Sequence, residues 1–139
     1  MILSKENITS TLPHRPPFVM VDQLIKASTE RIETSFEIHA SNILCEGDFL
    51  SFPGLIENIA QTCAAGLGYI SSQNGEGTKI GYIGAISKLK TYQRAKVGDT
   101  ISTKVNILQE FENIILIKGA NYAGDQMLVE CEMKIVIAA

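Results

Sequence analysis

Apolar and polar residues alternate in two segments of the chain. In the first, residues 31–40, one face consists of Ile32, Thr34, Phe36 and Ile38. The second, residues 127–137, alternates with the same period of two. Because successive side chains of a strand point to opposite faces of a sheet, this period predicts two strands with one buried face each.

The segment 55–70 has a different pattern, because it is apolar or small at almost every position. We expect a helix there, preceded by Pro53-Gly54 and followed by a turn over 71–78. A helix that is apolar nearly all round must be covered on most of its sides.

The other segments predict strands joined by turns. The expected strands are 18–25, 79–92 with a break near Gly84, and a hairpin formed by 100–111 and 113–122. A loop is expected over 41–53, and turns at 97–99 and 123–125.

This order of elements predicts a single α+β domain over residues 1–139. One antiparallel sheet of five or six strands, strongly curved, would wrap the long apolar helix. Such a sheet leaves a long edge strand, with which a second copy of the chain can pair to form a dimer.

Composition narrows the possible partners. The net charge is -3 and no basic tract occurs, which argues against nucleic acid and against an anionic membrane surface. No apolar run approaches the ~20 residues of a membrane span, and MILSKENITS does not resemble a secretory signal. The three cysteines, Cys45, Cys63 and Cys131, match neither a zinc site nor a disulfide framework, so we expect a cytoplasmic protein with Cys63 as a buried free thiol.

A single carboxylate, Glu57, stands on the apolar helix, with Gln61 one turn later. The two begin a stripe of small residues that includes Ala64 and Gly68. The opposite face, expected to pack on the sheet, is Ile56, Ile59, Cys63, Leu67 and Ile70. Glu57 is either a first-turn acid that favours the helix dipole or an acid in apolar surroundings, which favour the neutral form that a general acid needs.

The start of the helix offers a second chemical feature. Glycine lets a ligand approach the backbone, and the first N–H groups of a helix have no partner within it. Pro53, Gly54 and Leu55 are therefore candidates for binding a substrate, with the N–H groups of Gly54 and Leu55 holding an oxyanion.

A general acid needs a base as its counterpart. His39 lies on the polar face of a predicted strand and is most simply a surface residue. His14 lies in LPHRPP, where three prolines stiffen the backbone, and it is either a turn residue bonded to the backbone or a functional one. Asp22 and Asp48 are the remaining candidates, and Asp48 in Gly47-Asp48-Phe49 has the sequence of an ordinary turn.

Two motifs resemble a known family. LPHRPPFVMVDQLI, residues 12–25, resembles the pattern L-P-H-R-x-P-F-x-x-V-D. PGLIENIAQ, residues 53–61, resembles P-G-x-L-x-x-E-A-x-A-Q. Residues 83–101 and 117–135 resemble later segments of the same family. The sequence is thus similar to 3-hydroxyacyl-acyl carrier protein dehydratases of the FabZ kind, which have a hotdog fold.

The resemblance implies a dimer with two active sites at the interface, in which an acid and a histidine of one site come from different subunits. It implies an acyl carrier protein as partner, whose phosphopantetheine arm brings an acyl chain into a tunnel. The reaction would convert a 3-hydroxyacyl thioester into a trans-2-enoyl thioester without a metal or another cofactor. A homodimer is expected, with a heterodimer or a larger assembly as open alternatives.

One position departs from this pattern. The family carries its histidine in G-H-F-P-G, whereas the matching segment here, CEGDF, has Asp48. A divergent branch, resembling the dehydratases of aryl-polyene pathways, keeps L-P-H and E-x-x-A-Q without that motif, and this chain is most similar to that branch. We therefore expect His14 as base and Glu57 as acid, supported by Gln61 and Asp48.

Two other functions remain open from the sequence. The chain is alternatively an inactive partner subunit in a heterodimeric dehydratase, since the motif histidine is missing. It is alternatively an acyl thioesterase, in which Asp48 or Glu57 would activate water.

Overall fold

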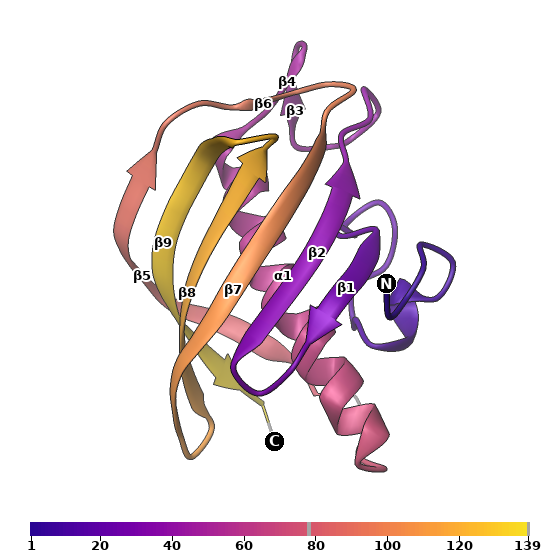
Figure 1. Ribbon diagram of the computed structural model, residues 1–139, viewed down its shortest axis with the longest axis vertical. Coiled ribbons are helices and arrows are strands. Elements are labelled where there is room, and N and C mark those ends of the chain that lie inside the picture. Colours follow the sequence, from indigo (N-terminus) through magenta and orange to yellow (C-terminus); the bar gives the residue numbers. More distant parts are fainter. Residues whose placement is uncertain (78, 139) are drawn as a thin grey trace.

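A 22-residue helix, α1 (Phe52–Gln73), packs against a curved sheet in the computed structural model, which describes residues 1–77 and 79–138 (Figure 1). The sheet has six antiparallel strands in the order β1-β2-β7-β8-β9-β5, and a small sheet contains β3, β4 and β6. The strands are β1 (Gln23–Ala27), β2 (Arg31–Glu37), β3 (Cys45–Glu46), β4 (Phe49–Leu50), β5 (Gly81–Thr91), β6 (Ala95–Lys96), β7 (Thr100–Phe111), β8 (Ile114–Ala123) and β9 (Gln126–Ile137). The predicted α+β fold, one helix wrapped by a sheet, is confirmed.

Helix α1 is longer at both ends than the predicted 55–70. It begins at Phe52 because Ser51 caps it, with the Ser51 hydroxyl accepting a hydrogen bond from the Gly54 N–H at 3.2 Å. It runs to Gln73, through the polar residues that predicted a turn, and Thr78 of that predicted turn lies outside the described residues. Because of the early start, the first turn contains no acid. Glu57 therefore stands in the second turn, where the helix dipole acts weakly on a charge. The dipole does not account for a carboxylate at this position.

The predicted strands of the six-stranded sheet are present, with changes at their ends. The short strands β3 and β4 lie in the segment 41–53 that was expected to be a loop, and β6 was not predicted. The expected break near Gly84 is a register shift between Ile83 and Ala85 within one continuous strand β5. Both predicted turns contain a glycine with positive φ, Gly98 at 97° and Gly124 at 60°. The strand expected over 18–25 begins only at Gln23, so the residues before it are irregular.

The face of α1 that packs on the sheet differs from the predicted one. Ile59 and Cys63 are buried as expected, but Ile56, Leu67 and Ile70 are only half-buried. The buried positions of the helix are Gly54, Leu55, Asn58, Ile59, Gln61, Thr62, Cys63, Ala65 and Gly66. Polar side chains thus face the core at several points, and each must find a hydrogen-bond partner there.

Strand β5 forms one edge of the six-stranded sheet, on the left in Figure 1. It pairs with β9 on one side, and nearly all of its residues are exposed. Its exposed apolar side chains include Tyr82, Ile83, Ile86 and Leu89. The long edge strand that the sequence predicts is therefore present. Within the described residues, no helix is long and apolar enough to cross a membrane.

Candidate active site

His14 lies on an irregular segment, residues 12–20, that we call the strap. The strap connects a 3-10 helix (Ile8–Ser10) to β1, and Figure 1 shows the N-terminal residues beside β1. The side chains of Leu12 and Met20, at its two ends, are buried in the core. Within the strap, the Arg15 guanidinium donates hydrogen bonds to the carbonyls of Leu12 and His14, at 2.7 and 2.8 Å. His14 is therefore carried by a segment whose position depends on contacts with the rest of the protein.

The strap brings His14 to Glu57 on α1. His14 Nε2 lies 3.7 Å from Glu57 Oε1, and the two side chains are 29% and 35% exposed. This contact between the two residues is made within one chain. The enclosed carboxyl expected from the sequence is not found, because a third of the Glu57 side chain is exposed in the single chain.

Gln61 connects the acid to the strap. Its side-chain amide donates to Glu57 Oε1 at 3.0 Å and to the Phe18 carbonyl at 2.8 Å. Its oxygen accepts a hydrogen bond from the Met20 N–H at 2.7 Å. Both polar atoms of the Gln61 side chain are thus directed at the strap or at Glu57, through three hydrogen bonds that hold the carboxylate relative to the backbone that carries His14.

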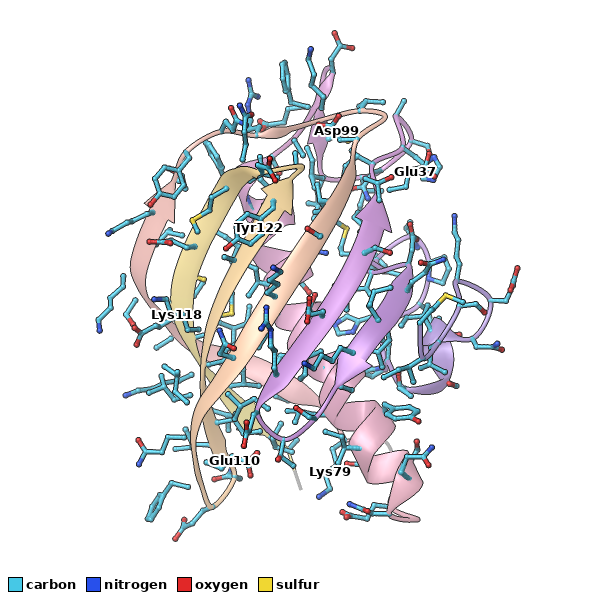
Figure 2. The ribbon with its side chains drawn as sticks, viewed as in Figure 1. Glu37, Lys79, Asp99, Glu110, Lys118 and Tyr122 are labelled. Atoms are coloured by element: carbon cyan, nitrogen blue, oxygen red, sulfur yellow. The ribbon has the colours of Figure 1, made fainter. Side chains whose placement is uncertain are left out.

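An open cleft of about 990 Å³ adjoins the pair. Its wall beside the pair is formed by Ala60 and Ala64, so the small residues of the predicted stripe do line a groove. Gln61, from the same stripe, is buried instead. The cleft continues past the end of α1 to β5 and to the tip of the β7–β8 hairpin. Figure 2 shows two of its lining residues, Lys79 and Glu110, at that end of the molecule.

The amides at the start of α1 are not free. The Gly54 N–H donates to the Ser51 hydroxyl at 3.2 Å, and the Leu55 N–H donates to the Ser51 carbonyl at 3.1 Å. Gly54 and Leu55 are buried, and Pro53 is exposed outside the cleft. The expectation of unpaired donors for an oxyanion at this point is therefore wrong, since the helix cap uses them.

The other candidate residues lie apart from the pair. Asp48 is exposed in the turn between β3 and β4, and it does not line the cleft of its own chain. Asp22 accepts a hydrogen bond from the Glu37 N–H at 2.8 Å, which is a structural role. His39 is half exposed beside Glu37, as expected for a surface histidine.

Cys63 lies under the cleft but is not a nucleophile. It is a free, buried thiol, as the sequence predicts. Burial, with the nearby charge of Glu110, raises the pKa of Cys63 to about 12. Because the thiolate is the reactive form, this residue is inert at neutral pH.

The sequence analysis missed Asn58, which is buried next to Glu57 in the chain. Its side-chain amide donates to the Met20 carbonyl at 2.8 Å. A polar residue at a core position of an otherwise apolar helix was the available signal, but its partners are more than 30 residues away in the sequence. Among the described residues, no group of three metal-ligating side chains comes together.

Comparison with known proteins identifies one matching family. The profile of the ApeP-like family, described as ApeP dehydratase, matches residues 6–138. The chain is 30% identical over 148 aligned positions to the 3-hydroxyacyl-acyl-carrier-protein dehydratase FabZ of Wolinella succinogenes, covering 99% of this chain and 97% of the relative. It is 29% identical to the FabZ of Clostridium kluyveri, covering 95% and 94%.

Solved structures show the same fold. The dehydratase heterocomplex ApeI:P from Xenorhabdus doucetiae matches with a TM-score of 0.83 at 18% identity, over 95% of this chain and 91% of the other. A hypothetical thioesterase from Streptococcus pneumoniae, solved with coenzyme A, matches with a TM-score of 0.64 at 12% identity, over 84% and 85%. At these identities the likeness concerns the fold alone.

Proposed function

The chain belongs to the family of ApeP-like dehydratases, and on this premise we propose that it dehydrates a carrier-bound 3-hydroxyacyl thioester with His14 and Glu57 as the proton-transfer pair. The observation that carries the assignment of the pair is the 3.7 Å contact between His14 Nε2 and Glu57 Oε1 beside an open cleft. A base and an acid in contact with one ligand site are what an elimination of water requires.

The chemical step needs two proton transfers. His14 Nε2 removes a proton from the α-carbon, whose acidity the thioester carbonyl increases. The electron pair of that bond forms the double bond between the α- and β-carbons as the β-carbon–oxygen bond breaks. The proton of the Glu57 carboxyl goes to the departing hydroxyl, so that water and a trans-2-enoyl thioester result.

The two groups are neighbours and do not stand on opposite sides of the ligand. Because the α-proton and the β-hydroxyl are on adjacent carbons, one wall of the cleft can serve both. The proton and the hydroxyl then leave from the same face of the substrate. The protonated His14 afterwards lies close enough to the Glu57 carboxylate to return the proton, directly or through the released water, which restores both residues.

Gln61 acts in this scheme by orienting the acid. Its amide donates to Glu57 Oε1, which leaves the other carboxyl oxygen to carry the proton that is transferred. Asp48 takes no step, since it lies outside the cleft of its own chain.

The site assignment is tested by isosteric replacement of the pair. His14→Gln and Glu57→Gln should each lower kcat for a 3-hydroxyacyl-carrier substrate by about 100-fold or more, because each removes one proton transfer. His39→Gln, at the other histidine of the chain, should leave kcat unchanged. Full turnover by either variant of the pair would show that the assignment is wrong.

The same assay separates dehydration from the other functions. A thioesterase would release a free acid and a free carrier thiol in place of an enoyl thioester. A subunit that only supports an active partner would show no turnover by itself, and adding the partner would restore activity even with His14→Gln. The comparisons favour neither alternative.

The partners follow from the substrate and the fold. We infer that an acyl carrier protein presents the thioester through its phosphopantetheine arm, and that the reaction takes place in the cytoplasm, where the free cysteines stay reduced. We further infer that a second hotdog subunit pairs along β5, either a copy of this chain or a related subunit. The exposed apolar edge strand supports this assembly, and the structural relative ApeI:P is a heterocomplex.

A further inference from the structure

Hydrogen bonds from α1 hold the strap that carries His14. Besides Gln61, which binds the Phe18 carbonyl and the Met20 N–H, Asn58 donates to the Met20 carbonyl at 2.8 Å. Both backbone groups of Met20 are therefore held by side chains of the helix that carries Glu57. The strap has no ladder bonds of its own before β1 begins, so these hydrogen bonds hold it together with the buried side chains of Leu12 and Met20.

Asn58 is in turn held from the opposite side. Its side-chain oxygen accepts hydrogen bonds from the Thr103 hydroxyl and from the Asn121 amide, the latter at 3.3 Å. The Asn121 amide also donates to the Leu55 carbonyl at 2.8 Å. Asn58 thus connects the strap, through the core, to β7 and β8. Its exposed fraction is 0%, which makes each lost hydrogen bond costly.

The His14 side chain makes no hydrogen bond within the described residues that would hold it in place. Its Nδ1 is covered and has no hydrogen-bond partner in the described part of the chain. Its Nε2 faces Glu57 at 3.7 Å, which is longer than a hydrogen bond. The distance between the two reactive groups therefore depends on how the strap sits on α1.

We propose that Asn58 is a positioning residue for the His14–Glu57 pair, acting through the Met20 carbonyl and the strap. The expected effect of Asn58 on kcat rests on the proposed function. The placement of His14 relative to Glu57 can be measured without turnover. Asn58 does not touch the substrate in this proposal. It sets the separation of the base from the acid.

The kinetic test compares Asn58→Ala with a matched control, Thr34→Val. Thr34 shares a buried hydrogen bond with Thr62 at 2.7 Å in the same core, and within the described residues its side chain makes no hydrogen bond to the strap. Asn58→Ala should lower kcat by about 10- to 100-fold with a smaller change in KM, because the pair is displaced while the cleft remains. Thr34→Val should lose stability without that loss of kcat. Equal kcat values for the two variants would overturn the proposal.

The second test records the NMR signals of the histidine rings, of which this chain has two, at one fixed pH. Replacing Glu57 by Gln in the wild type should change the chemical shifts of the His14 ring, because Glu57 Oε1 lies 3.7 Å from His14 Nε2. In the Asn58→Ala background the same replacement should change these shifts less, and in the Thr34→Val background as much as in the wild type. An equal change in all three backgrounds, or none in the wild type, would overturn the proposal.

The two tests separate this inference from the proposed function. If the chain has no dehydratase activity but the His14 chemical shifts behave as expected, the proposed function fails and the positioning role stands. If Asn58→Ala does not fold, Asn58→Ser is compared in its place, because its hydroxyl can keep a bond to Thr103 but is too short to reach the Met20 carbonyl.

Discussion

At the scale of single residues, Glu57 and Cys63 show how differently one helix can treat two ionisable groups. Glu57 faces the cleft, keeps a third of its side chain exposed and accepts a hydrogen bond from Gln61. Cys63 lies on the buried side of α1 and is almost fully covered. Because the two positions are six residues apart, they fall on different faces of the helix. Position on the helix therefore decides which group can exchange protons with a ligand.

The buried thiol predicts a pH dependence of stability. The pKa of Cys63 is raised from 9.0 to about 12 in the native protein. The unfolded chain therefore loses this proton at lower pH than the native state. The contribution of the protonated Cys63 thiol to the free energy of unfolding is fully present below pH 9. It is lost by about 1 kcal/mol per pH unit as the pH rises from 9 towards 12.

Urea unfolding of the wild type and of Cys63→Ala at pH 8 and pH 10.5 measures this contribution. The difference in free energy of unfolding between the two proteins should shrink at the higher pH. A difference that stays constant would mean that Cys63 ionises as easily in the native state as in the unfolded chain.

At the scale of elements, glycines allow α1 to approach its neighbours closely. A Cβ at Gly66 would lie 2.4 Å from the Ile32 side chain, and a Cβ at Gly119 would lie 2.4 Å from the Ile59 side chain. On the other side of the helix, a Cβ at Gly68 would lie 2.1 Å from the Thr11 carbonyl oxygen. The last contact is with backbone, which cannot rotate away, and it joins α1 to the segment just before the strap.

Gly68→Ala should therefore destabilise the protein by about 1–3 kcal/mol, because the N-terminal segment must move away from α1. Gly77→Ala is the matched control, since a Cβ at Gly77 meets nothing within 4 Å. Thermal unfolding of both variants is the measurement. A melting temperature of Gly68→Ala equal to that of Gly77→Ala would contradict the close packing at Thr11.

Much of the element order follows from local patterns, and the errors have physical causes. The alternation in 31–40 predicted the buried face of β2 correctly, because Ile32, Thr34 and Phe36 are buried. In the predicted strand 18–25, residues 18–22 are not strand, because Met20 is buried without a ladder, through contacts to α1. The polar Ser71–Gln73 predicted a turn, but exposed polar residues are also normal at a helix end.

The residues of the candidate site that belong to short sequence motifs were predictable. Glu57 and His14 were identified from short patterns, and the structure places them in contact. The use of the Gly54 and Leu55 amides by Ser51 was not foreseen, since it depends on the exact start of the helix. Asn58 was missed because its role arises from contacts with β7, β8 and the strap, which no local pattern contains.

At the scale of the whole molecule, the two edges of the six-stranded sheet are unequal. The edge formed by β5 is long, exposed and rich in apolar side chains, and some of its residues line the cleft. The edge formed by β1 is short. An unpaired apolar edge of this length favours pairing with another subunit, which would also cover part of the cleft.

A charge on β5 should therefore weaken the assembly. Ile86→Lys places a cation on the exposed edge, and we expect a smaller particle by analytical ultracentrifugation. Ile25→Lys, on the opposite edge at β1, is the control and should sediment like the wild type. If Ile25→Lys gives the smaller particle and Ile86→Lys does not, the interface lies at β1. If neither variant changes sedimentation, neither edge forms the interface.

The location of His14 and Glu57 in one chain also bears on how such assemblies evolve. When a gene encoding a subunit of this kind is duplicated, each copy inherits both residues of the proposed proton-transfer pair. Loss of the pair in one copy leaves the other pair whole, provided that the first copy still covers the shared edge. A single inactivating substitution in one copy would therefore produce a heterodimer of one catalytic and one purely structural subunit. A site whose acid and base came from different subunits would instead tie each copy to the chemistry of the other.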